Sequence, residues 1–165
     1  MIHPTAKIHP SAKIDPTADI GQNAKVRAGA RVEVNAYVGY GAVVAEDATV
    51  GVNAYVGYGA CVGANAYVGN HAYIGCYAVL RPGVDVGEHA YVGVDAKVGA
   101  DADVGEHAYV GQDAEVGAKS FVGDYAYIGV DAKVGADATV GYRAYVEPNA
   151  RVEANAEVRN DTRNS

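Results

Sequence analysis

The sequence predicts an all-β fold, a triangular parallel β-solenoid of nine 18-residue coils. A six-residue repeat runs without insertion over residues 2–163, which is 162 residues or 27 hexads, within one domain covering residues 1–165. The first place of every hexad is Ile, Val or once Leu (Leu80), and the fifth is Ala except at Val84, Ser120 and Thr162. The group VGEHAY at 86–91 returns at 104–109, 18 residues later, so three hexads are expected to close one coil.

The order of residue types within a hexad matches the alternation of side chains along a strand, where neighbours point to opposite faces. A strand over places 5, 6, 1 and 2 directs the Ala and the branched residue inward, and places 6 and 2 outward. Places 3 and 4 must then turn the chain. Place 4 is mostly Asn, Asp or Gly, which tolerate a left-handed backbone. Proline stands only at place 3, at residues 4, 10, 16, 82 and 148, as a turn allows.

Charge and hydropathy exclude several partners. The chain has 13 basic and 20 acidic residues, net charge −7, and residues 32–142 carry four basic against fourteen acidic residues. This acidic middle argues against a nucleic-acid partner, because such affinity rests on Lys and Arg at phosphates. No apolar run approaches the ~20 residues of a membrane span, and the start MIHPTAKIHP lacks a signal-peptide core. We therefore expect a cytoplasmic protein that binds neither nucleic acid nor membrane.

The opening IHPTAKIHPSAKIDPTADIG and the recurring VGxxA pattern resemble the hexapeptide-repeat left-handed β-helix family over residues 2–163. Lipid A acyltransferases and gamma-class carbonic anhydrases share this fold. The resemblance implies a left-handed coil and a homotrimer about an axis parallel to the solenoid. Family members with enzymatic activity usually interrupt the coils with loops and append a helical tail, whereas this repeat is uninterrupted. Such regularity is typical of a consensus-like or designed sequence.

Tyrosines recur at place 6 with the 18-residue period, so we expect one ladder of outward-facing rings. An exposed apolar patch of this size predicts an oligomer interface. The alternative is that the rings only stabilise neighbouring coils. The predicted interface residues are Tyr37, Tyr55, Tyr73, Tyr91, Tyr109, Tyr127 and Tyr145, with Tyr40 and Tyr58 at the next corner.

Histidines recur at place 4 of the corner before the tyrosines, at His71, His89 and His107. Three imidazoles beside a predicted interface are candidate zinc ligands, and a zinc-bound water would then be the nucleophile. The resemblance weakens this hypothesis, because carbonic anhydrase ligands stand at place 3 and at place 2 of the next hexad, where this chain has Asn70 and Gly75. The acyltransferase histidine also stands at place 3. Histidine is tolerated in left-handed turns, so solvated turn residues are the simpler interpretation.

We therefore predict a structural, self-assembling scaffold without catalytic residues or cofactor, whose partner is a second copy of itself. The first alternative is a zinc enzyme resembling gamma-class carbonic anhydrase, with His71, His89 and His107 as ligands. A hexapeptide-type acyltransferase is the second alternative.

Overall fold

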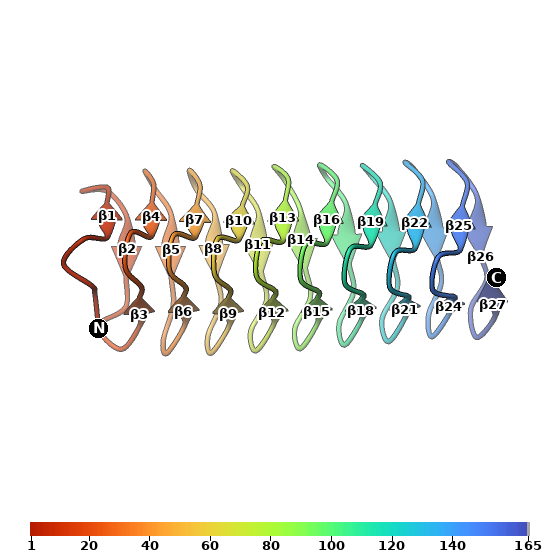
Figure 1. Ribbon diagram of the computed structural model, residues 1–165, viewed down its shortest axis with the longest axis horizontal. Coiled ribbons are helices and arrows are strands. Elements are labelled where there is room, and N and C mark those ends of the chain that lie inside the picture. Colours follow the sequence, from red (N-terminus) through yellow and green to blue (C-terminus); the bar gives the residue numbers. More distant parts are fainter. Residues whose placement is uncertain (165) are drawn as a thin grey trace.

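Successive hexads wind into the three sides of a straight solenoid in the computed structural model, which describes residues 1–164 (Figure 1). The coils stack in sequence order, so the two termini lie at opposite ends of the molecule. Three nine-stranded sheets form the three sides. The predicted all-β solenoid of nine coils is confirmed. Within residues 1–164, no helix is long and apolar enough to cross a membrane.

Each of the 27 strands has two residues. Sheet 1 contains β1 (Lys7–Ile8), β4 (Lys25–Val26), β7 (Val43–Val44), β10 (Cys61–Val62), β13 (Val79–Leu80), β16 (Lys97–Val98), β19 (Glu115–Val116), β22 (Lys133–Val134) and β25 (Arg151–Val152). Sheet 2 contains β2 (Lys13–Ile14), β5 (Arg31–Val32), β8 (Thr49–Val50), β11 (Tyr67–Val68), β14 (Asp85–Val86), β17 (Asp103–Val104), β20 (Phe121–Val122), β23 (Thr139–Val140) and β26 (Glu157–Val158). Sheet 3 contains β3 (Asp19–Ile20), β6 (Tyr37–Val38), β9 (Tyr55–Val56), β12 (Tyr73–Ile74), β15 (Tyr91–Val92), β18 (Tyr109–Val110), β21 (Tyr127–Ile128), β24 (Tyr145–Val146) and β27 (Arg163–Asn164).

Strand pairing is parallel, and it joins residues that are 18 apart, such as Tyr73 with Tyr91. The predicted strands of four residues are wrong in length, because only places 6 and 1 form the assigned strand. Places 5 and 2 still join the ladder through single hydrogen bonds. The Lys7 N–H donates to the Ala24 carbonyl at 2.8 Å, and the His9 N–H donates to the Val26 carbonyl at 2.8 Å.

The interior contains one small and one branched residue from each hexad. From Ala18 to Val152, the Ala residues of place 5 and the branched residues of place 1 are buried. Larger core side chains are few, namely Ile20, Ile74, Leu80 and Ile128. Ser120 replaces a core Ala, and its hydroxyl donates to the Gly117 carbonyl at 2.7 Å. This bond removes the cost of burying the polar group.

The turns confirm the role predicted for place 4. From Asn23 to Asp161, every residue at this place has a positive φ, between 52° and 73°. Most are Asn, Asp or Gly, but Lys119 at 56° and Arg143 at 52° also adopt it. Glycine at place 2 has a different cause, which is the close approach of the next coil. A Cβ at Gly57 would lie 2.7 Å from the Cys76 nitrogen, closer than contacting atoms come.

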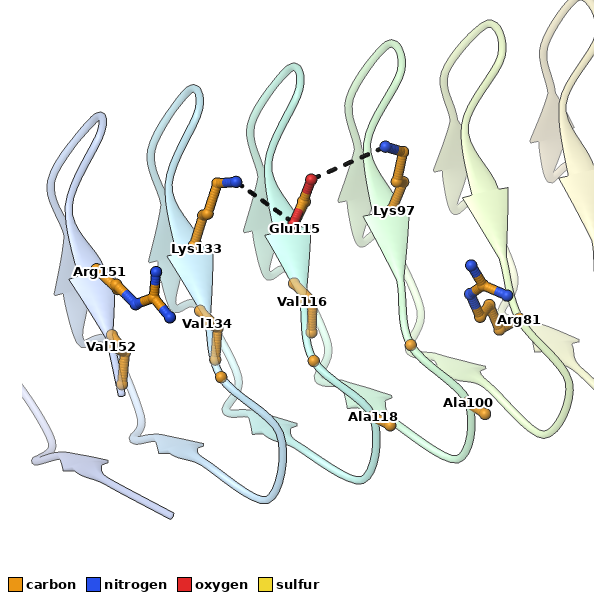
Figure 2. Close-up of a pocket in the computed structure, with 13 residues that line it drawn as sticks. Arg81, Lys97, Ala100, Glu115, Val116, Ala118, Lys133, Val134, Arg151 and Val152 are labelled. Carbon is orange, nitrogen blue, oxygen red and sulfur yellow. Dashed lines mark ion pairs between the residues drawn. The ribbon is translucent and has the colours of Figure 1, made fainter. Parts of the chain in front are cut away.

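Outward side chains of one sheet stand in rows along the solenoid. In sheet 1, residues of place 6 project from successive coils at Lys97, Glu115, Lys133 and Arg151 (Figure 2). Each residue lies directly above the one 18 positions earlier, and we call such a row of outward side chains a column. The neighbours that an outward side chain contacts are therefore the residues before and after it in its column.

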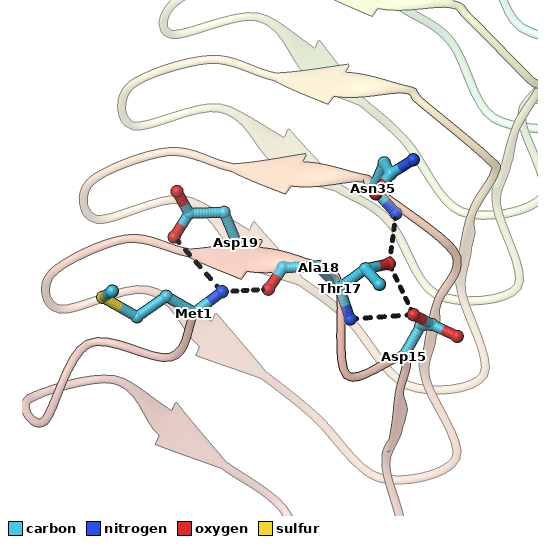
Figure 3. Close-up of polar contacts among 6 residues, drawn as sticks. All are labelled: Met1, Asp15, Thr17, Ala18, Asp19 and Asn35. Atoms are coloured by element: carbon cyan, nitrogen blue, oxygen red, sulfur yellow. Dashed lines mark hydrogen bonds and ion pairs between the residues drawn. The ribbon is translucent and has the colours of Figure 1, made fainter.

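The first coil has a turn of its own. Thr5, Ser11 and Thr17 occupy place 4 but are absent from the positive-φ residues. From Gly41 onward the place-4 N–H donates to a carbonyl of the preceding coil, as Asn53 does to Val34 at 2.9 Å. Among residues 1–164 no coil precedes the first one. A side chain two residues earlier accepts the place-4 N–H there in place of a carbonyl. Figure 3 shows that the Thr17 N–H donates to Asp15 Oδ1 at 2.8 Å, and the Asn35 N–H donates to Thr17 Oγ1 at 2.9 Å.

The same cap is repeated at the other two corners. The Thr5 N–H donates to His3 Nδ1 at 3.2 Å, and the Ser11 N–H donates to His9 Nδ1 at 3.2 Å. The opening sequence of His or Asp, Pro, then Thr or Ser therefore encodes an end cap. Proline at i+1 with a short polar residue at i is the preference of a type I turn, which fits the change in backbone conformation at place 4.

Replacing Thr17 with Val should lower the free energy of unfolding by about 1 kcal/mol, because the Asn35 N–H and the Asp15 carboxylate each lose a partner. Urea denaturation would measure it. Hydrogen exchange at the Asn35 amide should accelerate. Thr139→Val on β23 is the control, because its outward side chain stands on a strand paired on both sides, with β20 and β26. Equal destabilisation by both variants would show that the cap contributes nothing.

Candidate functional site

Seven tyrosines on sheet 3 form the tyrosine ladder: Tyr37, Tyr55, Tyr73, Tyr91, Tyr109, Tyr127 and Tyr145. Neighbouring rings are stacked, with centroids 4.5–5.0 Å apart and interplanar angles of 3–9°. All seven side chains are half-buried, because each ring covers its neighbour while its outer edge stays in solvent. The structure thus brings the predicted tyrosines together as one flat aromatic surface.

Burial shifts the ionisation of three ladder hydroxyls further from neutral pH. It raises the pKa of the Tyr55, Tyr91 and Tyr127 hydroxyls above the ordinary value of 10.0, and neighbouring tyrosines raise it further. At the carboxyl end, the Arg163 guanidinium lies 4.7 Å from the centre of the Tyr145 ring, in cation–π geometry. At the amino end, Asp19 occupies the ladder position before Tyr37.

A second aromatic group extends this surface around the following corner. Tyr40 and Tyr58 are stacked at 5.1 Å, with exposed fractions of 40% and 44%. Tyr77 meets Tyr58 edge-on at 5.1 Å. The sequence prediction included Tyr40 and Tyr58, which occupy place 3, but missed Tyr77, which occupies place 4. The turn conformation at Tyr77 directs its ring towards Tyr58. Tyr77 has a positive φ of 58°, and the sequence pattern alone did not show that this backbone conformation brings the two rings together.

The predicted histidines form a stack. His71, His89 and His107 are exposed, at positive φ of 56–58°. Their rings lie 4.8 Å apart with interplanar angles of 4° and 5°, and Tyr125 continues the stack at 4.8 Å. Beside them, the Asn70 side chain donates to Glu88 Oε1 at 2.8 Å. This hydrogen bond occupies one oxygen of the Glu88 carboxylate.

The imidazoles of one chain do not fit a shared zinc ion. Zinc needs ligand nitrogens about 2.0–2.1 Å away and converging on one point, whereas the lone pairs of parallel rings lie in parallel planes. Among residues 1–164, no group of three or more His, Cys, Asp or Glu side chains could hold a metal ion. A zinc site using His71, His89 or His107 would therefore need ligands from a second copy.

Sequence reasoning missed a pair of carboxylates on sheet 2. Asp85 and Asp103 are directly paired on β14 and β17, with Tyr67 and Phe121 on the flanking strands. Partial burial raises the pKa of both carboxyls, and at Asp103 the negative charges of Asp85 and Asp124 raise it further. The 18-residue separation of Asp85 and Asp103 at place 6 could have predicted this pair, because it places the two aspartates opposite each other on adjacent coils.

Asp103→Asn should raise the melting temperature at pH 7, because the ionised carboxylate is disfavoured in the folded state. A pKa raised by folding makes stability greatest below the unfolded pKa and lowers it as pH rises through the folded pKa. The advantage of Asn should therefore shrink as the pH falls through the raised pKa of Asp103. Thermal denaturation across this range, with Asp137→Asn at an exposed corner as control, would measure it. A gain independent of pH would contradict this assignment.

Comparison with known proteins identifies the fold. No family model and no curated protein matches the sequence. LpxA from Acinetobacter baumannii matches with a TM-score of 0.89 and 19% identity, covering 93% of this chain and 67% of that one. A UDP-N-acetylglucosamine acyltransferase matches at 0.88 and 16%, covering 98% and 71%. The UDP-N-acetylglucosamine O-acyltransferase (LpxA) of Moraxella catarrhalis matches at 0.79 and 20%, covering 93% and 71%.

These neighbours are hexapeptide-repeat acyltransferases built on a left-handed β-helix, and the chain has the same fold. The sequence-based recognition of this fold is confirmed. Sequence identities of 16–20% demonstrate the fold alone.

Proposed function

We propose that the protein is a structural β-solenoid that assembles with copies of itself through the tyrosine ladder. The observation that carries this proposal is the uninterrupted stack of seven half-buried rings on one side of the molecule. Tyrosine is enriched in protein interfaces, because it combines a large apolar ring with a polar edge. A second copy presents the same repeat spacing, so the outer ring edges of the two copies can meet in register along the ladder.

The ordering of the ladder favours association. Binding usually requires side chains to lose rotamer freedom, but these rings are already held by their neighbours at 4.5–5.0 Å. Tyrosine hydroxyls are neutral near pH 7 because their ordinary pKa is about 10, so the surface has no ionised hydroxyls to desolvate. Burial raises the pKa of Tyr55, Tyr91 and Tyr127 further in the same direction. The assembly that the family resemblance implies is a homotrimer whose axis runs parallel to the solenoid, along the ladder.

Replacing Tyr91 and Tyr109 together with Lys should convert the oligomer to monomers, because two charges would enter the centre of an apolar contact. Native mass spectrometry should show the particle mass of the wild type fall to that of one chain. Tyr67→Lys on sheet 2 is the matched control, since it adds a charge at an exposed tyrosine on another side of the solenoid. A monomeric wild type, or an unchanged mass for the double variant, would refute the interface.

Acyl transfer is the second candidate function. The structural neighbours named above are acyltransferases, and the chain contains a histidine stack at one corner of the same fold. An imidazole is the usual general base for such chemistry. The exposed rings of His71, His89 and His107 are the candidates for that role.

If the chain is an acyltransferase that uses this stack, His89→Asn should abolish transfer from an acyl donor to an amino or hydroxyl acceptor. Asparagine retains the left-handed backbone that His89 adopts at 57°. Asp95→Asn at another corner, also at 57°, is the control. Full activity in His89→Asn would remove the stack from the reaction. Measuring zinc in the same samples tests the alternative of a metal held between two copies, which predicts that His89→Asn loses the ion.

A further inference from the structure

Sheet 1 carries an unusual excess of positive charge. Seven of the 13 Lys and Arg residues stand on its strands or directly after them, at Lys7, Lys25, Arg27, Arg81, Lys97, Lys133 and Arg151. Two carboxylates, Glu115 and Glu153, stand at the same positions, and Glu46 of the following turn lies 3.7 Å from Arg27. The net charge of this side is therefore +4 on a chain of net charge −7. A surface whose sign opposes that of the whole chain attracts anionic ligands.

A groove of about 710 Å³ lies within this side, along the coils from β13 to β25. Its charged residues are Arg81, Lys97, Glu115, Lys133 and Arg151, each from a different coil (Figure 2). The floor consists of small residues, with Gly117 and Ala118 near its middle. Packing dictates this floor, because a Cβ at Gly117 would lie 2.4 Å from the next coil's backbone. The groove is therefore a fixed hollow bordered by long cationic side chains.

Glu115 occupies the centre of the groove as an internal anion. Its carboxylate lies 3.8 Å from Lys97 Nζ and 3.6 Å from Lys133 Nζ. Both lysine side chains remain more than half exposed, so each ammonium can still reach a second anion. Lys97 and Lys133 are two coils apart, which is about 9.6 Å at the usual strand spacing. Arg81 and Arg151 place further cations towards the two ends.

We propose that this groove binds a linear acidic polysaccharide of the polyuronate type, lying along the solenoid axis. A 1,4-linked β-mannuronate chain is an extended ribbon in which every second carboxylate points to the same side. Its repeat of two sugars is comparable to the spacing of two coils, so successive carboxylates on one side meet Lys97 and Lys133. Guanidinium groups bind carboxylates bidentately, which suits Arg81 as an end contact. At the other end, Arg151 Nε lies 3.0 Å from Glu153 Oε1, so Arg151 meets the ligand as part of an ion pair.

The groove's shape and composition favour this ligand over other polyanions. Single-stranded nucleic acids are held by aromatic side chains on which bases stack, and none of the described residues lining the groove is aromatic. A membrane surface is broad and cannot enter a hollow bordered by side chains. The groove lies on sheet 1, away from the tyrosine ladder of sheet 3, so this site and the proposed self-association can be tested separately.

The test is calorimetric titration of the whole protein with hexamannuronate at low salt. The combined variant Lys97→Gln and Lys133→Gln should weaken binding about tenfold, which corresponds to about 1.4 kcal/mol shared between two exposed ion pairs. Glu115→Gln should strengthen binding severalfold, because it removes the competing carboxylate. Lys13→Gln on β2 removes one positive charge on another side and should leave the affinity within about twofold. Its match in charge is the single variant Lys97→Gln, which should weaken binding about threefold.

Three outcomes would overturn the proposal. The first is no binding of hexamannuronate to the folded wild type, with folding verified by circular dichroism. The second is equal weakening by Lys13→Gln and by the groove variant, which would indicate attraction to charge in general. The third is that inorganic polyphosphate or phosphatidylserine vesicles bind with the same dependence on Lys97 and Lys133 and at least as tightly. Neutral mannohexaose should not bind, and its binding would contradict the role of the carboxylates.

Discussion

The parallel hydrogen-bond ladder between each residue and the one 18 positions later is the constraint on which the rest of the structure depends. It places every coil one strand spacing from the next, so stacked ring centroids lie 4.5–5.0 Å apart along the tyrosine ladder. At this distance a Cβ at Gly57 would collide with the next coil, which favours Gly at place 2. From Gly51 to Gly141 this place is Gly in every hexad except at Arg81. Each coil encloses only a narrow interior, which Ala and Val fill.

The same ladder organises the exterior into columns. A column of identical aromatic residues becomes a stack, as in the tyrosine ladder and at His71, His89 and His107. A column of alternating charge becomes an ion-pair chain, as at Lys97, Glu115 and Lys133. The three sides consequently differ in chemistry: sheet 3 is aromatic from Tyr37 to Tyr145 with a charged residue at each end, sheet 1 is basic, and sheet 2 holds a carboxylate pair. A neutral aromatic side suits contact with a second copy, and it leaves the charged groove of sheet 1 facing solvent.

The ends of the solenoid show where local chemistry replaces the ladder. The first coil has no preceding coil to accept the N–H groups of Thr5, Ser11 and Thr17. The side chains of His3, His9 and Asp15 accept them instead. The sequence analysis identified the prolines here as turn residues but did not predict the cap, because the hexad pattern describes only interior coils. Hydroxyl oxygens at place 4 were a visible departure from the Asn, Asp and Gly that follow.

The sequence by itself determined the coil length, the inward and outward places and the left-handed turn residues, because each follows from a periodicity of two or six along the chain. The tertiary structure decided how side chains in a column meet. Because the rings of His71, His89 and His107 are stacked, their nitrogens do not converge on one point, as a zinc site within one chain requires. The raised pKa of Asp103 and the groove around Glu115 likewise depend on neighbours 18 residues away and on rotamers. Sequence order specifies which residues share a column, but only packing sets their distances, directions and exposure.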